Sequence, residues 1–137
     1  MSTFAAMDIA RTGMGFSRYW LDTISHNLAN VNNVQPGDEE PFRARYVVAG
    51  TNTDEIAATG SGVHVAGVEL DQGEAPKVYD PNHPLADDDG FIVRPVVDLA
   101  GQLADMILAQ RSYQLSAKSV TTAKEAYEAA LRIGDRR

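Results

Sequence analysis

The stretch that decides the fold is residues 97–134, VDLAGQLADMILAQRSYQLSAKSVTTAKEAYEAALRIG. It contains no proline, and its spine residues recur with alternating steps of four and three along the whole stretch. This a/d heptad predicts a helix whose apolar seam faces another helix. The spine consists of Leu99, Leu103, Met106, Gln110, Tyr113, Ala117, Val120, Lys124, Tyr127 and Leu131.

The length of this helix is itself informative. At about 1.5 Å per residue it would extend for about 57 Å, whereas a domain of this chain length is roughly 30–35 Å across. A helix that overhangs its own domain needs a partner along much of its length.

A second heptad lies at the other end of the chain, in residues 4–31. Its spine runs from Phe4 to Val31, and a flanking apolar row that includes Phe16 and Trp20 widens the stripe. The inner row is expected to pack on the C-terminal helix, and the outer row is the candidate surface for other subunits. Gly13 and Gly15 weaken this helix, each by about 1 kcal/mol.

Four asparagines between Asn27 and Asn33 follow this heptad. Their amides can cap the last helical carbonyls, which is the favoured interpretation. The alternative is that they bond to the backbone of adjacent chains. His26 has no ligand-type neighbour at metal-binding spacing and is interpreted as a polar helix-surface residue.

The middle of the chain is acidic and β-rich. Residues 37–90 hold twelve acidic and three basic side chains, whereas both ends are close to neutral. Residues 34–42 are predicted as a loop, residues 51–62 as a turn-rich segment, and a small antiparallel β unit is expected around them. Its strands are Arg43–Ala49, Val63–Leu70 with a bulge at Gly67, Lys77–Tyr79 and Phe91–Val93.

The segment 80–90 is the one place that hints at metal. Asp87, Asp88 and Asp89 precede Gly90, as in part of a calcium loop, but position 96 is Val96 where the EF-hand pattern needs a glutamate. A tight turn with Gly90 at positive φ is preferred over a calcium module. Asp98, just before the long helix, can complement its dipole.

Several classes of function are disfavoured by composition. The chain has no cysteine, a net charge of −7, and no clustered Lys and Arg of the kind that nucleic-acid binding needs. No apolar run approaches the length of a membrane span, and no cleavable signal peptide is visible. Neither a nucleophile elbow nor a phosphate loop occurs, so no catalytic residue, cofactor or metal ligand is assigned.

Two segments then identify a resemblance. Residues 21–32, LDTISHNLANVN, closely resemble the N-terminal motif of flagellar axial proteins of the rod, hook and hook-associated type. Residues 78–87, VYDPNHPLAD, resemble a segment peculiar to a proximal-rod branch of that family, as does the end of the chain from Met106 to Lys124. The likeness covers nearly the whole chain, although residues 50–62 match weakly.

The resemblance implies a non-enzymatic structural protein with an α+β fold. It implies helices 1–33 and 97–137 paired as an inner coiled coil, with an acidic loop and small β domain, 34–96, facing outward. It implies type III export without a cleaved signal, assembly in the rod within the periplasm, and torque transmission to the distal rod and hook. The implied partners are copies of itself, other rod proteins, the export apparatus and adaptor proteins on the MS-ring side, with no nucleic acid and no membrane span. The expected subunit-interface residues are Leu21, Ile24, Asn27, Leu28, Ala29, Asn30, Val31, Leu103, Met106, Gln110, Tyr113, Ala117, Val120, Tyr127 and Leu131.

Two alternatives stay open: another axial rod protein of the same assembly, or, from a different class, a cytoplasmic helical-hairpin adaptor. Because both terminal stretches lack most of their partners before assembly, they are expected to be largely disordered in the monomer.

Overall fold

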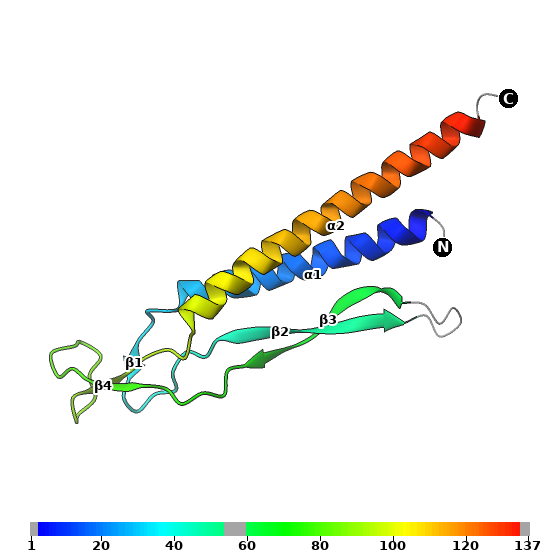
Figure 1. Ribbon diagram of the computed structural model, residues 1–137. Helices are drawn as coiled ribbons and strands as arrows, with labels where there is room; N and C mark the ends of the chain where they lie inside the picture. The colour runs from blue at the N-terminus through cyan, green and yellow to red at the C-terminus, as the bar shows by residue number, and fades with distance from the viewer. Residues whose placement is uncertain (1–2, 54–59, 135–137) are drawn as a thin grey trace.

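Two long helices form the frame of the molecule. The computed structural model describes residues 3–53 and 60–134. Helix α1 spans Thr3–Ala29 and helix α2 spans Leu99–Gly134. They run antiparallel, so that the start of α1 and the end of α2 lie at the same end of the molecule (Figure 1). Helix α2 begins two residues later than predicted, because the side chain of Asp98 accepts a hydrogen bond from the Ala100 amide at 3.1 Å and its carbonyl accepts one from Gln102.

The strands form two separate sheets. Strands β2 (Arg45–Thr53) and β3 (Gly60–Leu70) make a long antiparallel ribbon, and its register slips beside Gly67, next to the predicted bulge. Strands β1 (Gln35–Pro36), β5 (Phe91–Val93) and β4 (Lys77–Tyr79) make a short antiparallel sheet with β5 in the middle. The α+β class with two pairing terminal helices is confirmed, and the expected single β unit is divided in two.

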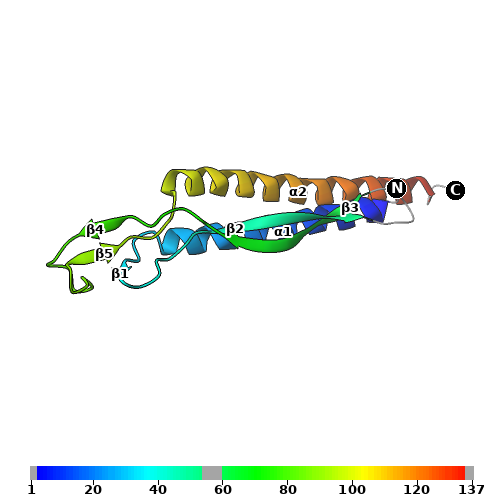
Figure 2. The same cartoon turned by 90° about the horizontal axis from the view of Figure 1, so that it is seen from below.

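Three layers lie side by side along the long axis. Helix α1 lies between α2 and the β2–β3 ribbon, while the short sheet extends beyond the start of α2 (Figures 1 and 2). Buried apolar side chains lie along α1, where it packs on α2 and the ribbon, and in the short sheet. Among the described residues they are Ala10, Ile24, Ala44, Ile92, Val93 and Ala109.

Two local predictions are corrected. The turn-rich segment 51–62 contributes strand residues at both ends, because the β2–β3 ladder continues to the pair Thr53 and Gly60; residues 54–59 lie outside the described part. The loop predicted for 34–42 contains the two-residue strand β1, which exists because β5 offers it a free edge. The predicted turn at Gly90 is confirmed, with φ of 81°.

Candidate assembly surfaces

The seam between α1 and α2 is lined by small side chains. A Cβ atom on Gly13 would lie 2.9 Å from the Ser116 hydroxyl oxygen, so a larger residue at that position requires the Ser116 side chain to move. The Ser17 hydroxyl is fully buried, donates to the Gly13 carbonyl at 2.8 Å and lies 3.0 Å from the Ser112 hydroxyl. Close contact of small residues therefore sets the rotation of α2 about its own axis.

A buried amide joins three elements at the other end of the seam. The side chain of Asn27 is fully buried, donates to the Arg45 carbonyl and to the Gln102 side chain at 2.8 Å each, and accepts from the Arg45 amide at 2.9 Å. Asn27 thus pairs with the backbone of β2 and with α2, all within one chain. The capping role predicted for the asparagines is filled by Asn30, which donates to the His26 carbonyl at 2.8 Å.

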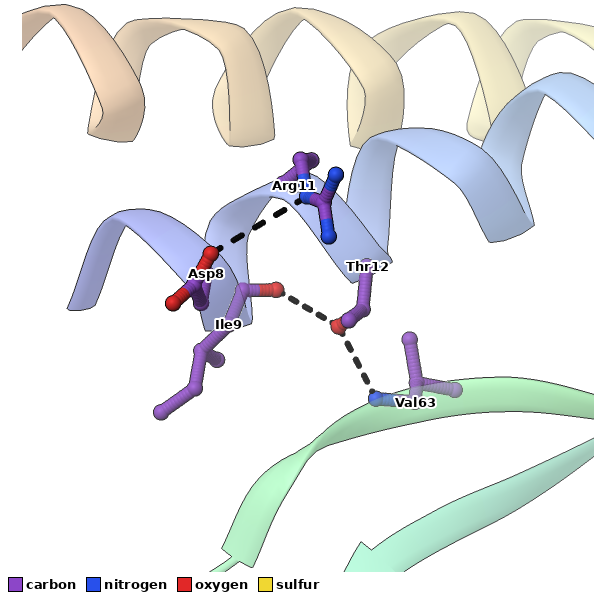
Figure 3. Close-up of polar contacts among 5 residues, drawn as sticks. All are labelled: Asp8, Ile9, Arg11, Thr12 and Val63. Atoms are coloured by element: carbon purple, nitrogen blue, oxygen red, sulfur yellow. Dashed lines mark hydrogen bonds and ion pairs between the residues drawn. The ribbon is translucent and has the colours of Figure 1, made fainter. Parts of the chain in front are cut away.

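A threonine holds the ribbon at the opposite end of α1. The Thr12 hydroxyl donates to the Ile9 carbonyl at 2.7 Å and accepts from the Val63 amide at 3.1 Å (Figure 3). Nearby, Asp8 and Arg11 approach to 4.0 Å on the exposed surface. Thr12 and Asn27 therefore fix β3 and β2 to α1 at two widely separated points.

Helix α2, by contrast, has several large apolar side chains that are about half exposed or more. Leu99 and Leu103 are each 46% exposed, Ile107 is 52% exposed and Leu115 is 69% exposed. Leu131 and Ile133 are exposed near its end. At about 1.5 Å per residue, the 36 residues of α2 extend for about 54 Å and the 27 residues of α1 for about 40 Å, so α1 covers one face of only part of α2.

The predicted interface residues fall into three groups by burial within the single chain. Ile24 and Asn27 are buried and used inside the molecule. Half-buried are Leu21, Leu28, Asn30, Val31, Met106, Ala117, Val120 and Tyr127. Exposed are Ala29, Leu103, Gln110, Tyr113 and Leu131.

Sequence reasoning missed the residues that actually face α1 most closely. Gln102 and Ala109 are buried, and Ser112 and Ser116 lie on the same face, beside the predicted spine. A search for large apolar residues passes over them. The available signal was the seven-residue spacing of Gln102, Ala109, Ser116 and Ala123, which places small and amide side chains on one helical stripe.

The acidic turn uses its own carboxylate. The Asp87 side chain accepts from the amides of Phe91 at 2.7 Å and Asp89 at 3.1 Å, as expected of a tight turn. Within residues 3–53 and 60–134, no three His, Cys, Asp or Glu side chains gather in a way that could hold a metal ion.

In the β2–β3 ribbon, burial and a hydrogen bond to Asp71 raise the pKa of Tyr46.

Neither helix, over the residues that the structure describes, is long and apolar enough to cross a membrane.

The two terminal helices expose rows of apolar side chains, and buried polar contacts fix the position of one helix against the other. This arrangement is typical of structural subunits that assemble through the surfaces of their helices.

Comparisons with known proteins narrow this class. The family described as "Flagellar basal body rod FlgEFG protein C-terminal" matches residues 89–133. The flagellar basal-body rod protein FlgC of Escherichia coli O6:H1 is 36% identical over 98% of this chain and 99% of the relative. FlgC of Salmonella typhimurium is 34% identical over the same shares, and FlgC of Aquifex aeolicus is 33% identical over 93% of this chain and 94% of its own. The chain belongs to the FlgC family of flagellar basal-body rod proteins, and it is a structural subunit of that rod.

Proposed function

We propose that this chain is a subunit of the proximal rod and polymerises through its terminal helices to pass motor torque to the distal rod and hook. The observation that carries the proposal is the exposed apolar surface of α2, with Leu99, Leu103 and Ile107 each about half exposed. Many such contacts acting in parallel can carry load, since dispersion contacts are individually small and collectively large.

The proposal also covers the location of the subunit, its partners and the division of the chain into units. It places the subunit in the periplasmic part of the rod, after type III export without a cleaved signal. Its partners there are copies of itself, other rod proteins and adaptor proteins on the MS-ring side. It assigns no catalytic role, and it divides the chain into helices 1–33 and 97–137 and a middle unit 34–96.

We propose two roles for the expected interface residues, according to how far each is buried within the single chain. Leu103, Gln110, Tyr113 and Leu131 would contact a neighbour directly, because each keeps an exposed part of its side chain. Ile24 and Asn27 would act indirectly, by holding α1 and α2 in the geometry that exposes those side chains.

The proposal is tested by deleting this chain and examining purified basal bodies by electron microscopy. Rings without a rod are expected, together with loss of swimming, and the tagged chain should be recovered with basal bodies rather than with cytosol. Intact rods in the deletion strain, or a chain found only in cytosol, would favour an adaptor.

A second test addresses the helix surface. The variant Leu103→Ser should lower rod occupancy at limiting expression, because burying the rest of a half-exposed leucine contributes about 1 kcal/mol, or roughly fivefold in affinity. The matched control is Thr121→Ser, an exposed position on the same helix, which should leave occupancy unchanged.

A further inference from the structure

The short sheet packs on no helix and on neither strand of the ribbon. Among the helices and strands that the structure describes, β4 lies against β5 alone, and β5 lies against β4 and β1. The sheet extends beyond the start of α2, which does not cover it (Figures 1 and 2). A sheet whose strands have two or three residues is marginal unless a helix or further strands support it, so this sheet would be stabilised by an added strand.

Strand β4 has a free edge. The Arg94 amide donates to the Pro76 carbonyl at 3.0 Å, so these two residues form a hydrogen-bonded pair just before β4 begins. Because such pairs alternate with pairs that make no hydrogen bond, the backbone groups of Lys77 and Tyr79 point away from β5. Within residues 3–53 and 60–134, no backbone group meets them on that side. Two residues of β4 therefore offer a donor and an acceptor each to an extended segment.

The opposite side of the sheet offers no comparable edge. The Asp87 side chain accepts from the Phe91 amide at 2.7 Å, and the Asp87 amide donates to the Phe91 carbonyl at 2.9 Å. Strand β1 covers the rest of β5, and its Pro36 has no N–H to give to a further strand. Of the two edges of this sheet, β4 is therefore the one able to take another strand.

An exposed aromatic pair accompanies this edge. Tyr79 is 65% exposed, and Phe91, directly opposite on β5, is 37% exposed. Their ring centroids are 5.2 Å apart with the planes at 63°, so one ring meets the other edge-on and much of the Tyr79 ring stays open. Gly90 leaves room for this ring, because a Cβ atom there would lie 2.9 Å from it. The edge thus combines backbone groups with an aromatic surface held in place.

Charge around the edge selects the chemistry of its partner. Residues 74–91 contain five acidic side chains and one lysine, Lys77, and Asp88 and Asp89 are exposed. This net charge repels nucleic acid and anionic lipid, and a second copy would bring two such acidic loops together. Lysine and arginine side chains are attracted by the carboxylates and can pack on the face of Tyr79 through a cation–π contact.

We infer that β4 is a docking edge for an extended segment, carrying lysine or arginine, of another basal-body protein. The segment adds a fourth strand by hydrogen bonding to Lys77 and Tyr79, and one of its cationic side chains packs on the Tyr79 ring. Because Pro76 and Pro81 bound the three residues of β4, the segment is short and binds weakly when isolated, and assembly of the rod holds it in place. This inference rests on the proposed function and specifies the chemistry of one partner.

The docking edge is tested by photo-cross-linking. Cells express Tyr79→p-benzoylphenylalanine as the only copy, purified basal bodies are irradiated, and cross-linked peptides are identified by mass spectrometry. We expect a product with a different basal-body protein, joined within a few residues of a lysine or arginine. The control is Ala49→p-benzoylphenylalanine, at an exposed position of the ribbon, which should not give that product.

Second-site variants separate the backbone from the charge. Lys77→Pro removes an outward N–H and no bond to β5, so it should lower the yield roughly fivefold, the effect of about one hydrogen bond. Lys77→Ala removes the same charge and should not lower the yield. Asp88→Lys combined with Asp89→Lys should lower it roughly threefold without altering the backbone.

The outcomes distinguish this inference from the proposed function. Basal bodies that contain the chain but give no product, or a product with carbohydrate or a second copy, would overturn the docking edge and leave the rod assignment intact. Equal yields from Lys77→Pro and Lys77→Ala would overturn the added strand.

Absence of the chain from basal bodies would instead reject the proposed function. The docking edge would then be decided with the purified chain and the peptide acetyl-Gly-Arg-Val-Arg-Gly-amide at millimolar concentration. This peptide should shift the amide NMR resonances of Lys77 and Tyr79, and its uncharged citrulline counterpart should shift them much less. Equal shifts with both peptides, or none, would overturn the inference.

Discussion

Replacing Asn27 by alanine should lower the free energy of unfolding by more than the loss of one hydrogen bond, because this side chain joins α1, α2 and β2. The amide makes three hydrogen bonds of 2.8 to 2.9 Å, and both it and Gln102 are almost fully buried. Asn27→Ala removes all three and leaves the Arg45 backbone and the Gln102 amide without these partners. At about 1 kcal/mol net per bond, the expected loss in the free energy of unfolding is about 3 kcal/mol.

The loss is measured by urea and thermal unfolding of the purified chain. Far-UV circular dichroism follows the helices, and the fluorescence of Trp20, the single tryptophan, follows α1 two turns from the junction. For a chain of this size the midpoint of thermal unfolding should fall by about 10 °C. Ser25→Ala is the matched control, because its exposed hydroxyl bonds only to the Leu21 carbonyl of its own helix. The control should cost less than about 0.5 kcal/mol.

A double-mutant cycle isolates the contact between the helices. Asn27→Ala and Gln102→Ala should be non-additive by about 1 kcal/mol, because either change alone breaks the same hydrogen bond. If Asn27→Ala cost no more than Ser25→Ala, or if the two changes were fully additive, the reasoning that this amide fixes the relative positions of α1, α2 and β2 would be refuted.

Other expectations are simpler to check. Thr12→Val keeps the side-chain shape but removes the acceptor of the Val63 amide, so hydrogen exchange at Val63 should accelerate, by roughly fivefold for about 1 kcal/mol, while amides of α2 are unaffected. Gly13→Val should displace the Ser116 hydroxyl and weaken the packing of α1 on α2, so the midpoint of thermal unfolding should fall; an unchanged midpoint would contradict the close approach. The dilute chain should show less helix by circular dichroism than the 27 and 36 residues of α1 and α2, with terminal turns lost first because the buried contacts lie nearer the junction; full helix content would argue against this.

Sequence periodicity was sufficient for the helices because their information is local. Both heptads extend over many turns, so the existence and approximate bounds of α1 and α2 followed from spacing, as did the strands that pair with near neighbours. The surplus of apolar surface on α2 was also readable, because a helix of about 54 Å cannot be covered by a chain of this size. The amide of Asn27 was noticed in the sequence, but its partners were not, since Arg45 and Gln102 are distant in the chain.

The sequence by itself therefore determined that this protein has two long amphipathic terminal helices, an acidic β-rich middle and more apolar helix surface than one copy can bury. Only the tertiary structure decided which stripe of α2 faces inward. A periodic pattern defines a stripe, but the rotation of a helix is set by how closely its neighbour can approach. Here the small residues Gly13, Ser17 and Ala109 and the buried amide of Asn27 set it, and Leu103 and Ile107 are left facing outward.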